Sequence, residues 1–75
     1  MEKLIELLED IQPGPDYANS TALIDNHELS SFSVVSLVAE LEDAYGITIP
    51  AVEVVAENFN SARAMLDMIE RLKKA

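Results

Sequence analysis

The sequence contains no cysteine and a single histidine, His27. Disulfides, cysteine-based zinc sites and thiol nucleophiles are therefore excluded, and one histidine cannot build a histidine-rich metal site. A chain of 75 residues has no room for a second core, so we expect one domain over residues 1–75. Many small domains are stabilised by disulfides or a bound metal. Since this chain has neither kind of cross-link, helix packing must stabilise it.

Positive charge is scarce and is missing from the middle of the chain. The five cations are Lys3, Arg63, Arg71, Lys73 and Lys74. Residues 4–62 hold eleven carboxylates and no cation, and the net charge of the chain is −9. Such a surface repels nucleic-acid phosphates and anionic lipids, so we expect no nucleic-acid partner. It attracts proteins with basic patches, and this attraction weakens as salt is added.

Long apolar runs are also missing. The sequence therefore predicts no membrane span. The acidic, amphipathic start of the chain has no basic segment ahead of an apolar one, as a secretory signal would have. We therefore expect an acidic, monomeric protein in the cytoplasm.

The first helix is predicted over about Glu2 to Ile11, where apolar and acidic residues follow helical spacing. Pro13-Gly14-Pro15 ends it, because proline cannot continue a helix. The following loop, residues 12–30, is unusually long for a compact domain unless it is functional or packed down. Its apolar side chains indicate packing against the helices: Tyr17, Leu23, Ile24 and Leu29.

A second helix is predicted to begin near Ser30 or Ser31, since both are good cap residues and the polar loop ends there. It ends at Gly46, because glycine commonly follows a helix C-terminus. Its core stripe comprises Val34, Leu37, Val38, Leu41 and Tyr45.

Two further segments complete the predicted fold. Residues 47–50 form an extended connector, and a helical turn or two lies between Val52 and Phe59. A last helix runs from about Ser61 to Lys73, capped by Asn60 or Ser61. Its inner stripe comprises Ala62, Met65, Leu66, Ile69 and Leu72. The predicted fold is all-α: a four-helix bundle with three longer helices, one short helix and a long first loop.

The sequence shows no convincing catalytic group. Ser31, His27 and Asp25 are the candidates for a hydrolase triad, but they lie within seven residues and lack a G-x-S-x-G turn. Two glycines cannot supply a phosphate-binding or dinucleotide-binding loop. Residues 25–28 lack the spacing and the glycine of a calcium loop. We expect a non-catalytic protein without a metal site.

The outer side of the second predicted helix mixes carboxylates with apolar groups. These residues are Phe32, Val35, Ala39, Glu40, Glu42 and Asp43. One interpretation is that Phe32 folds back over the first loop. The other is a docking surface, where carboxylates steer a partner and apolar groups anchor it.

Several stretches together carry a family resemblance. The first is Leu29-Ser30-Ser31-Phe32, followed by Val34-Val35. The second runs from Leu41 to Pro50 as Leu-Glu-Asp-Ala-Tyr-Gly-Ile-Thr-Ile-Pro, and the third covers residues 57–61. Together they resemble the acyl carrier proteins, which are phosphopantetheine-binding carriers, over essentially the whole chain. The resemblance implies a four-helix bundle of acyl-carrier type and a single carrier domain.

The resemblance also implies a site and its partners. Ser31 matches the serine that receives 4′-phosphopantetheine from coenzyme A through a phosphopantetheinyl transferase. A helix start suits a phosphodiester, because its N–H groups and dipole favour negative charge. The arm would hold an acyl or aminoacyl group as a thioester, as in fatty acid or polyketide biosynthesis. Other implied partners are cargo-loading and cargo-processing enzymes with basic docking patches.

The chain departs from the family pattern at the residue before the attachment serine, which is Ser30 where acyl carriers usually have aspartate. The start of the helix is also weakly acidic, with Ser33 and Ser36, which shifts the expected partner contacts toward Glu40, Glu42 and Asp43.

Two functions follow from these observations. The first is a carrier that presents a thioester-linked substrate on Ser31 to partner enzymes. The alternative is an unmodified carrier-like domain that binds a partner through its acidic second helix. The cargo stays open among a fatty acid, a polyketide intermediate, an amino acid and D-alanine.

Overall fold

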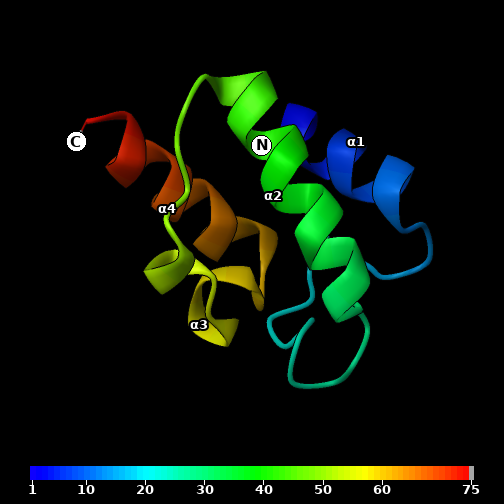
Figure 1. Cartoon of the computed structure of the whole chain (residues 1–75). Helices are drawn as coiled ribbons and strands as arrows, with labels where there is room; N and C mark the ends of the chain where they lie inside the picture. The colour runs from blue at the N-terminus through cyan, green and yellow to red at the C-terminus, as the bar shows by residue number, and fades with distance from the viewer. Residues whose placement is uncertain (75) are drawn as a thin grey trace.

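The computed structural model describes residues 1–74, in which every regular element is helical. The three longer helices are α1 (Glu2–Ile11), α2 (Ser31–Tyr45) and α4 (Ala62–Lys73), and the two short elements between α2 and α4 are η1 (Ala51–Glu53) and α3 (Ala56–Phe59). Helix α1 packs against α2 and α4, and α3 packs against α4 (Figure 1). The predicted all-α bundle, with three longer helices and a short one, is confirmed. None of the described helices has the length and apolar character of a membrane span.

The ends of the helices follow local sequence signals. The Ser30 hydroxyl accepts a hydrogen bond from the Ser33 amide at 3.1 Å and so caps α2. The Ser61 hydroxyl caps α4 in the same way, from the Ala64 amide at 3.0 Å. Gly46 ends α2 in the left-handed region, with φ of 64°, where a side chain would be strained. Of the two cap candidates predicted for each helix, Ser30 and Ser61 take the role.

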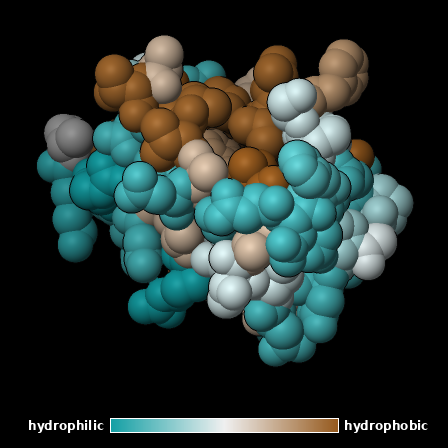
Figure 2. Space-filling view, turned by 90° about the horizontal axis from the view of Figure 1, so that it is seen from below, coloured by the Kyte–Doolittle hydropathy of each residue, from teal (hydrophilic) through white to brown (hydrophobic). Residues whose placement is uncertain are grey.

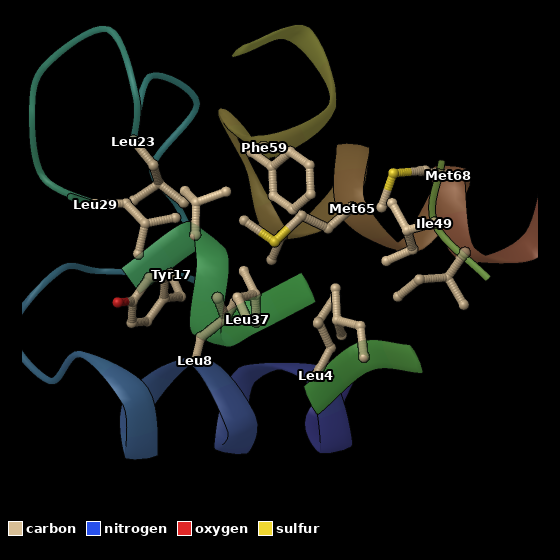
Figure 3. Packing of buried hydrophobic residues seen from close by; sticks show 14 residues of the cluster. Leu4, Leu8, Tyr17, Leu23, Leu29, Leu37, Ile49, Phe59, Met65 and Met68 are labelled. Atoms are coloured by element: carbon tan, nitrogen blue, oxygen red, sulfur yellow. The ribbon is translucent and has the colours of Figure 1, made fainter. Parts of the chain in front are cut away.

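One hydrophobic core joins the longer helices, α3 and the first loop (Figure 3). The largest fully buried side chains are Leu4, Leu8, Leu23, Leu37, Leu41, Phe59, Met65, Met68 and Ile69. Leu37 and Leu41 of α2, and Met65 and Ile69 of α4, lie on the stripes that the periodicity predicts, and Leu4 and Leu8 follow the helical spacing of α1. Four residues of the predicted stripes are only partly buried: Val38 and Tyr45 of α2, and Leu66 and Leu72 of α4. Met68, outside the predicted α4 stripe, is 1% exposed.

The first loop packs down on the bundle, as its apolar residues predict. Tyr17, Leu23 and Leu29 are each at most 3% exposed. Asn60, which follows α3, holds the middle of the loop. Its backbone oxygen accepts a hydrogen bond from the Leu23 amide at 2.8 Å, and its side-chain oxygen accepts from the next two amides of the loop. Burial and hydrogen bonds therefore both determine the course of this loop.

An ion pair fastens η1 to α4. The Arg71 guanidinium donates to both carboxylate oxygens of Glu53, at 2.8 and 3.0 Å. Asn58 donates to the backbone oxygen of Glu53 at 2.7 Å and to its carboxylate at 3.0 Å. The hydrogen bond from Arg71 lowers the pKa of the Glu53 carboxyl. These contacts hold the segment between α2 and α3 against α4.

The cation-free middle of the chain predicts that salt stabilises the fold. The salt bridges among residues 1–74, Arg63–Asp67 and Arg71–Glu53, both use exposed arginines and offset little of the repulsion among the carboxylates. Because salt screens this repulsion, we expect moderate sodium chloride to stabilise the fold by about 1 kcal/mol, or roughly 4–8 °C in melting temperature. Circular dichroism melts across a salt series measure the effect. A melting temperature that is flat or falls would show that net repulsion does not limit stability.

Candidate functional site

Ser31 is the first residue of α2, and it is exposed to solvent. Its neighbour Ser30 is engaged in capping: the Ser30 hydroxyl accepts from the Ser33 amide and lies 3.0 Å from the Ser33 hydroxyl. Ser31 lies outside this capping network. Of the two adjacent serines, Ser31 is therefore the one that presents an available hydroxyl at the helix start.

The start of α2 has the donors and the charge that a phosphate ester on Ser31 needs. The first turn of a helix leaves backbone N–H groups without intrahelical acceptors, and the helix dipole adds partial positive charge. Only one of these amides, that of Ser33, is taken by the Ser30 side chain. The first turn of α2 contains no acidic residue that would repel a phosphate. The residues present thus fit a phosphodiester at this position.

A groove of about 650 Å³ opens beside Ser31, between the end of the first loop, the start of α2 and the segment that leads into α3. Its lining includes Leu29, Val34, Val35, Val54, Val55 and Phe59. His27 is the one ionisable residue among those that line it. The groove therefore suits an apolar group better than a charged one.

Exposed apolar side chains continue the groove onto the surface. Phe32 is 83% exposed and Val35 is 72% exposed, while Val54 and Val55 are 40% and 44% exposed. Figure 2 shows apolar side chains gathered along one edge of the molecule. We call these four residues, Phe32, Val35, Val54 and Val55, the apolar rim. The interpretation that Phe32 folds back over the first loop is wrong, because its side chain points into solvent.

The residues predicted for the outer side of the second helix differ in their exposure to solvent. The exposed ones are Phe32, Val35, Ala39, Glu40 and Asp43. Glu42 differs, because it is half-buried and its carboxylate accepts a hydrogen bond from the Ile49 amide at 2.8 Å. It ties the extended connector to α2, so the expectation that its side chain lies free on the outer surface is wrong. Ser33, expected at the weakly acidic helix start, is buried at 9% exposure and belongs to the cap.

Between Val52 and Phe59 the sequence predicts only a helical turn or two, whereas in the structure this segment also forms the second wall of the groove. Its signal in the sequence is the concentration of valines at 52, 54 and 55. The elements η1 and α3 have three and four residues, so they cannot bury every one of these side chains. Val52, at 81% exposure, is the most open of them.

The three residues considered for a hydrolase triad do not form one. The Asp25 carboxylate accepts a hydrogen bond from the side-chain nitrogen of Asn60 at 3.2 Å instead of orienting His27. His27 is an exposed loop residue with a positive φ of 58°. Within residues 1–74, no three acidic, histidine or cysteine side chains come together as a metal site.

Comparison with protein families finds a match to the family described as phosphopantetheine attachment site, over residues 2–69. The matched stretch begins with α1 and reaches into α4, so it contains Ser31 and the whole groove. Neither the curated proteins nor the solved structures yield a match.

Proposed function

The chain belongs to the phosphopantetheine attachment site family, whose prosthetic group is 4′-phosphopantetheine, and we propose that it carries this group on Ser31. The observation that supports Ser31 is its position as the exposed first residue of α2, outside the Ser30 cap and beside the apolar groove. Once attached, the group supplies a thiol that holds an acyl or aminoacyl cargo as a thioester. Domains of this family are generally non-catalytic, which agrees with a carrier role.

The surrounding residues have separate tasks in this proposal. Ser30 holds the start of α2 in place, and the first-turn amides stabilise the charge of the phosphodiester. The apolar walls of the groove accept the apolar part of the arm or of its cargo. The alternative, an unmodified interaction domain, is not favoured, because the family match is to the attachment site itself.

We also propose that partner enzymes dock over the apolar rim. An enzyme that acts at Ser31 must bring its reacting atoms to that hydroxyl, so its surface must cover the residues beside it. Phe32 and Val35 follow Ser31 on α2 and are exposed. Val35 lines the groove together with Val54 and Val55. Covering these side chains removes apolar area from water, which favours association. Ala39, Glu40 and Asp43 lie further along the exposed side of α2. Ala39 extends the apolar contact, and the two carboxylates attract basic patches of the partner.

The experiment that tests the carrier function is the intact mass of the chain after incubation with coenzyme A and a broad-specificity phosphopantetheinyl transferase. We expect the mass to increase by one phosphopantetheine group per chain, and peptide mapping to locate the group on Ser31. An unchanged mass, under conditions that modify a known carrier, would overturn the proposal in favour of the unmodified domain.

Ser30→Asp, which restores the residue usual in acyl carriers, is expected to speed modification several-fold. Aspartate keeps the cap on the Ser33 amide and adds a charge that the helix dipole favours, so the melting temperature should change little. Time courses of the mass increase for the two proteins, alongside their melts, measure both effects. Equal rates would mean that Ser30 does not slow recognition by the transferase.

A further inference from the structure

Gln12, the residue that ends α1, ties together parts of the chain that meet just ahead of Ser31. Its side-chain oxygen accepts a hydrogen bond from the Ser30 amide at 3.1 Å. Its side-chain nitrogen donates to the carbonyl oxygen of Glu28. Its own backbone carbonyl accepts from the hydroxyl of the buried Tyr17. One half-buried residue thus contacts both the early and the final part of the first loop.

The side-chain contacts of Gln12 exceed what the end of α1 requires. The backbone N–H of Gln12 already closes the helix on the Leu8 carbonyl at 2.9 Å. The Asn60 side chain holds the Ile24 and Asp25 amides in the middle of the loop. The Leu23 carbonyl accepts from the Glu28 and Leu29 amides at 2.9 Å, but these bonds join one part of the loop to another and none of them reaches α1. The side chain of Gln12 is therefore the group that tethers the last three loop residues, 28–30, to α1.

The tether reaches Ser31 through Ser30. The Ser30 backbone is extended, with φ of −74° and ψ of 156°, and its hydroxyl holds the Ser33 amide. Its amide is held by Gln12. Because Ser30 is fixed at its amide by one contact and at its side chain by another, the backbone that leads into Ser31 has little freedom to turn.

We infer that Gln12 is a positioning residue for Ser31, holding residues 28–30 so that the Ser31 hydroxyl is presented in one orientation at the start of α2. The inference rests on the proposed function, because it concerns the transfer of the arm to Ser31. Gln12 is not among the residues that line the groove, so it acts through Ser30 and not by touching a partner's reacting atoms.

The chemistry of the amide explains why glutamine suits this position. The carbonyl of residue 28 and the N–H of residue 30 both face the Gln12 side chain, so the site needs one donor and one acceptor. A glutamine amide offers a donor and an acceptor at once. Methionine has a similar length but neither group, and a glutamate carboxylate keeps the acceptor but cannot donate to the Glu28 carbonyl.

The test is steady-state kinetics of modification by the transferase, with the concentration of the unmodified chain varied. Gln12→Met is expected to lower kcat about tenfold and to change KM less than about twofold, because orientation of the reacting group is lost while the apolar rim is intact. Gln12→Glu is expected to show an intermediate kcat, since it keeps the hydrogen bond to Ser30. The matched control is Asn60→Ala, which removes the side-chain acceptor of the Ile24 and Asp25 amides in the same loop and is expected to leave kcat near that of the parent chain.

Hydrogen exchange at the Ser30 amide checks the tether itself. It should quicken in Gln12→Met and stay unchanged in Asn60→Ala. If the parent chain accepts the arm and Gln12→Met shows an unchanged kcat, the positioning role is wrong while the carrier function stands. An equal loss of kcat in Asn60→Ala would assign the effect to general loosening of the loop and overturn the role as well. If the parent chain accepts no arm, the proposed function fails and the role of Gln12 fails with it. Should Gln12→Met not fold, Gln12→Glu serves as the test: a lowered kcat supports the positioning role, and a kcat equal to that of the parent chain overturns it.

Discussion

Replacing Ser31 with alanine is expected to abolish modification, so that the intact mass stays that of the unmodified chain after incubation with coenzyme A and the transferase. The hydroxyl oxygen is the atom that would form the ester, and alanine has none. The fold should be unaffected, because Ser31 is exposed, takes no part in the Ser30 cap and occupies a helical position that alanine favours. Circular dichroism of the same sample verifies that the variant is folded.

The control for this prediction is Ser30→Ala. It removes the adjacent hydroxyl and with it the cap on Ser33, at a cost of about 1 kcal/mol, but leaves Ser31 in place. Modification is still expected, on Ser31, although at a lower rate if the start of α2 frays. A mass increase in Ser31→Ala, or its loss in a folded Ser30→Ala alone, would place the attachment on Ser30.

Truncating Phe32 to alanine is expected to raise the KM of the transferase for this carrier about tenfold, with little change in kcat. An aromatic anchor at the centre of an interface is commonly worth more than 1 kcal/mol, and each 1.4 kcal/mol or so is a factor of about ten. At 83% exposure, Phe32 contributes little to the core, so the melting temperature should be unchanged. The loss should persist at high salt, because apolar contacts are not screened. An unchanged KM would remove the apolar rim from the docking surface.

Charge reversal on the same helix distinguishes the electrostatic attraction of a partner from the apolar contact that Phe32 makes with it. The double variant Glu40→Lys and Asp43→Lys is expected to slow association strongly at low salt and less at high salt. The control reverses Glu2 and Glu6 on α1, which changes the net charge equally on another element. Equal losses of rate in the two double variants would mean that only bulk charge matters.

Glu42 is unsuitable for such a charge reversal. Its carboxylate accepts from the Ile49 amide, and Ile49 is buried in the core. Lysine at this position would leave that amide without its acceptor, at a cost of about 1–3 kcal/mol, and would confuse a loss of docking with a loss of stability.

The helices could be predicted from the sequence because their signals are local. Apolar residues at helical spacing, proline after α1 and glycine after α2 lie within a few residues of the ends that they determine. The family resemblance likewise depended on short stretches around Ser31 and Gly46, and the match over residues 2–69 bears out that family. For these features the neighbouring residues are sufficient, since each helix end is decided by the backbone groups of a single turn.

The surroundings of Ser31 depended instead on residues far apart in the chain. Val54 and Val55 line the groove with Val35, about twenty positions away in sequence, and Arg71 of α4 bonds Glu53 at the start of their segment. Glu42 turns toward the connector because the buried Ile49 amide needs an acceptor, whereas helical periodicity alone placed it on the outside. The tether from Gln12 to Ser30 spans eighteen positions of sequence. Such pairings depend on which polar groups and apolar faces come together when the helices pack. The sequence by itself therefore determined the helices, whereas the tertiary structure decided which residues surround and hold Ser31.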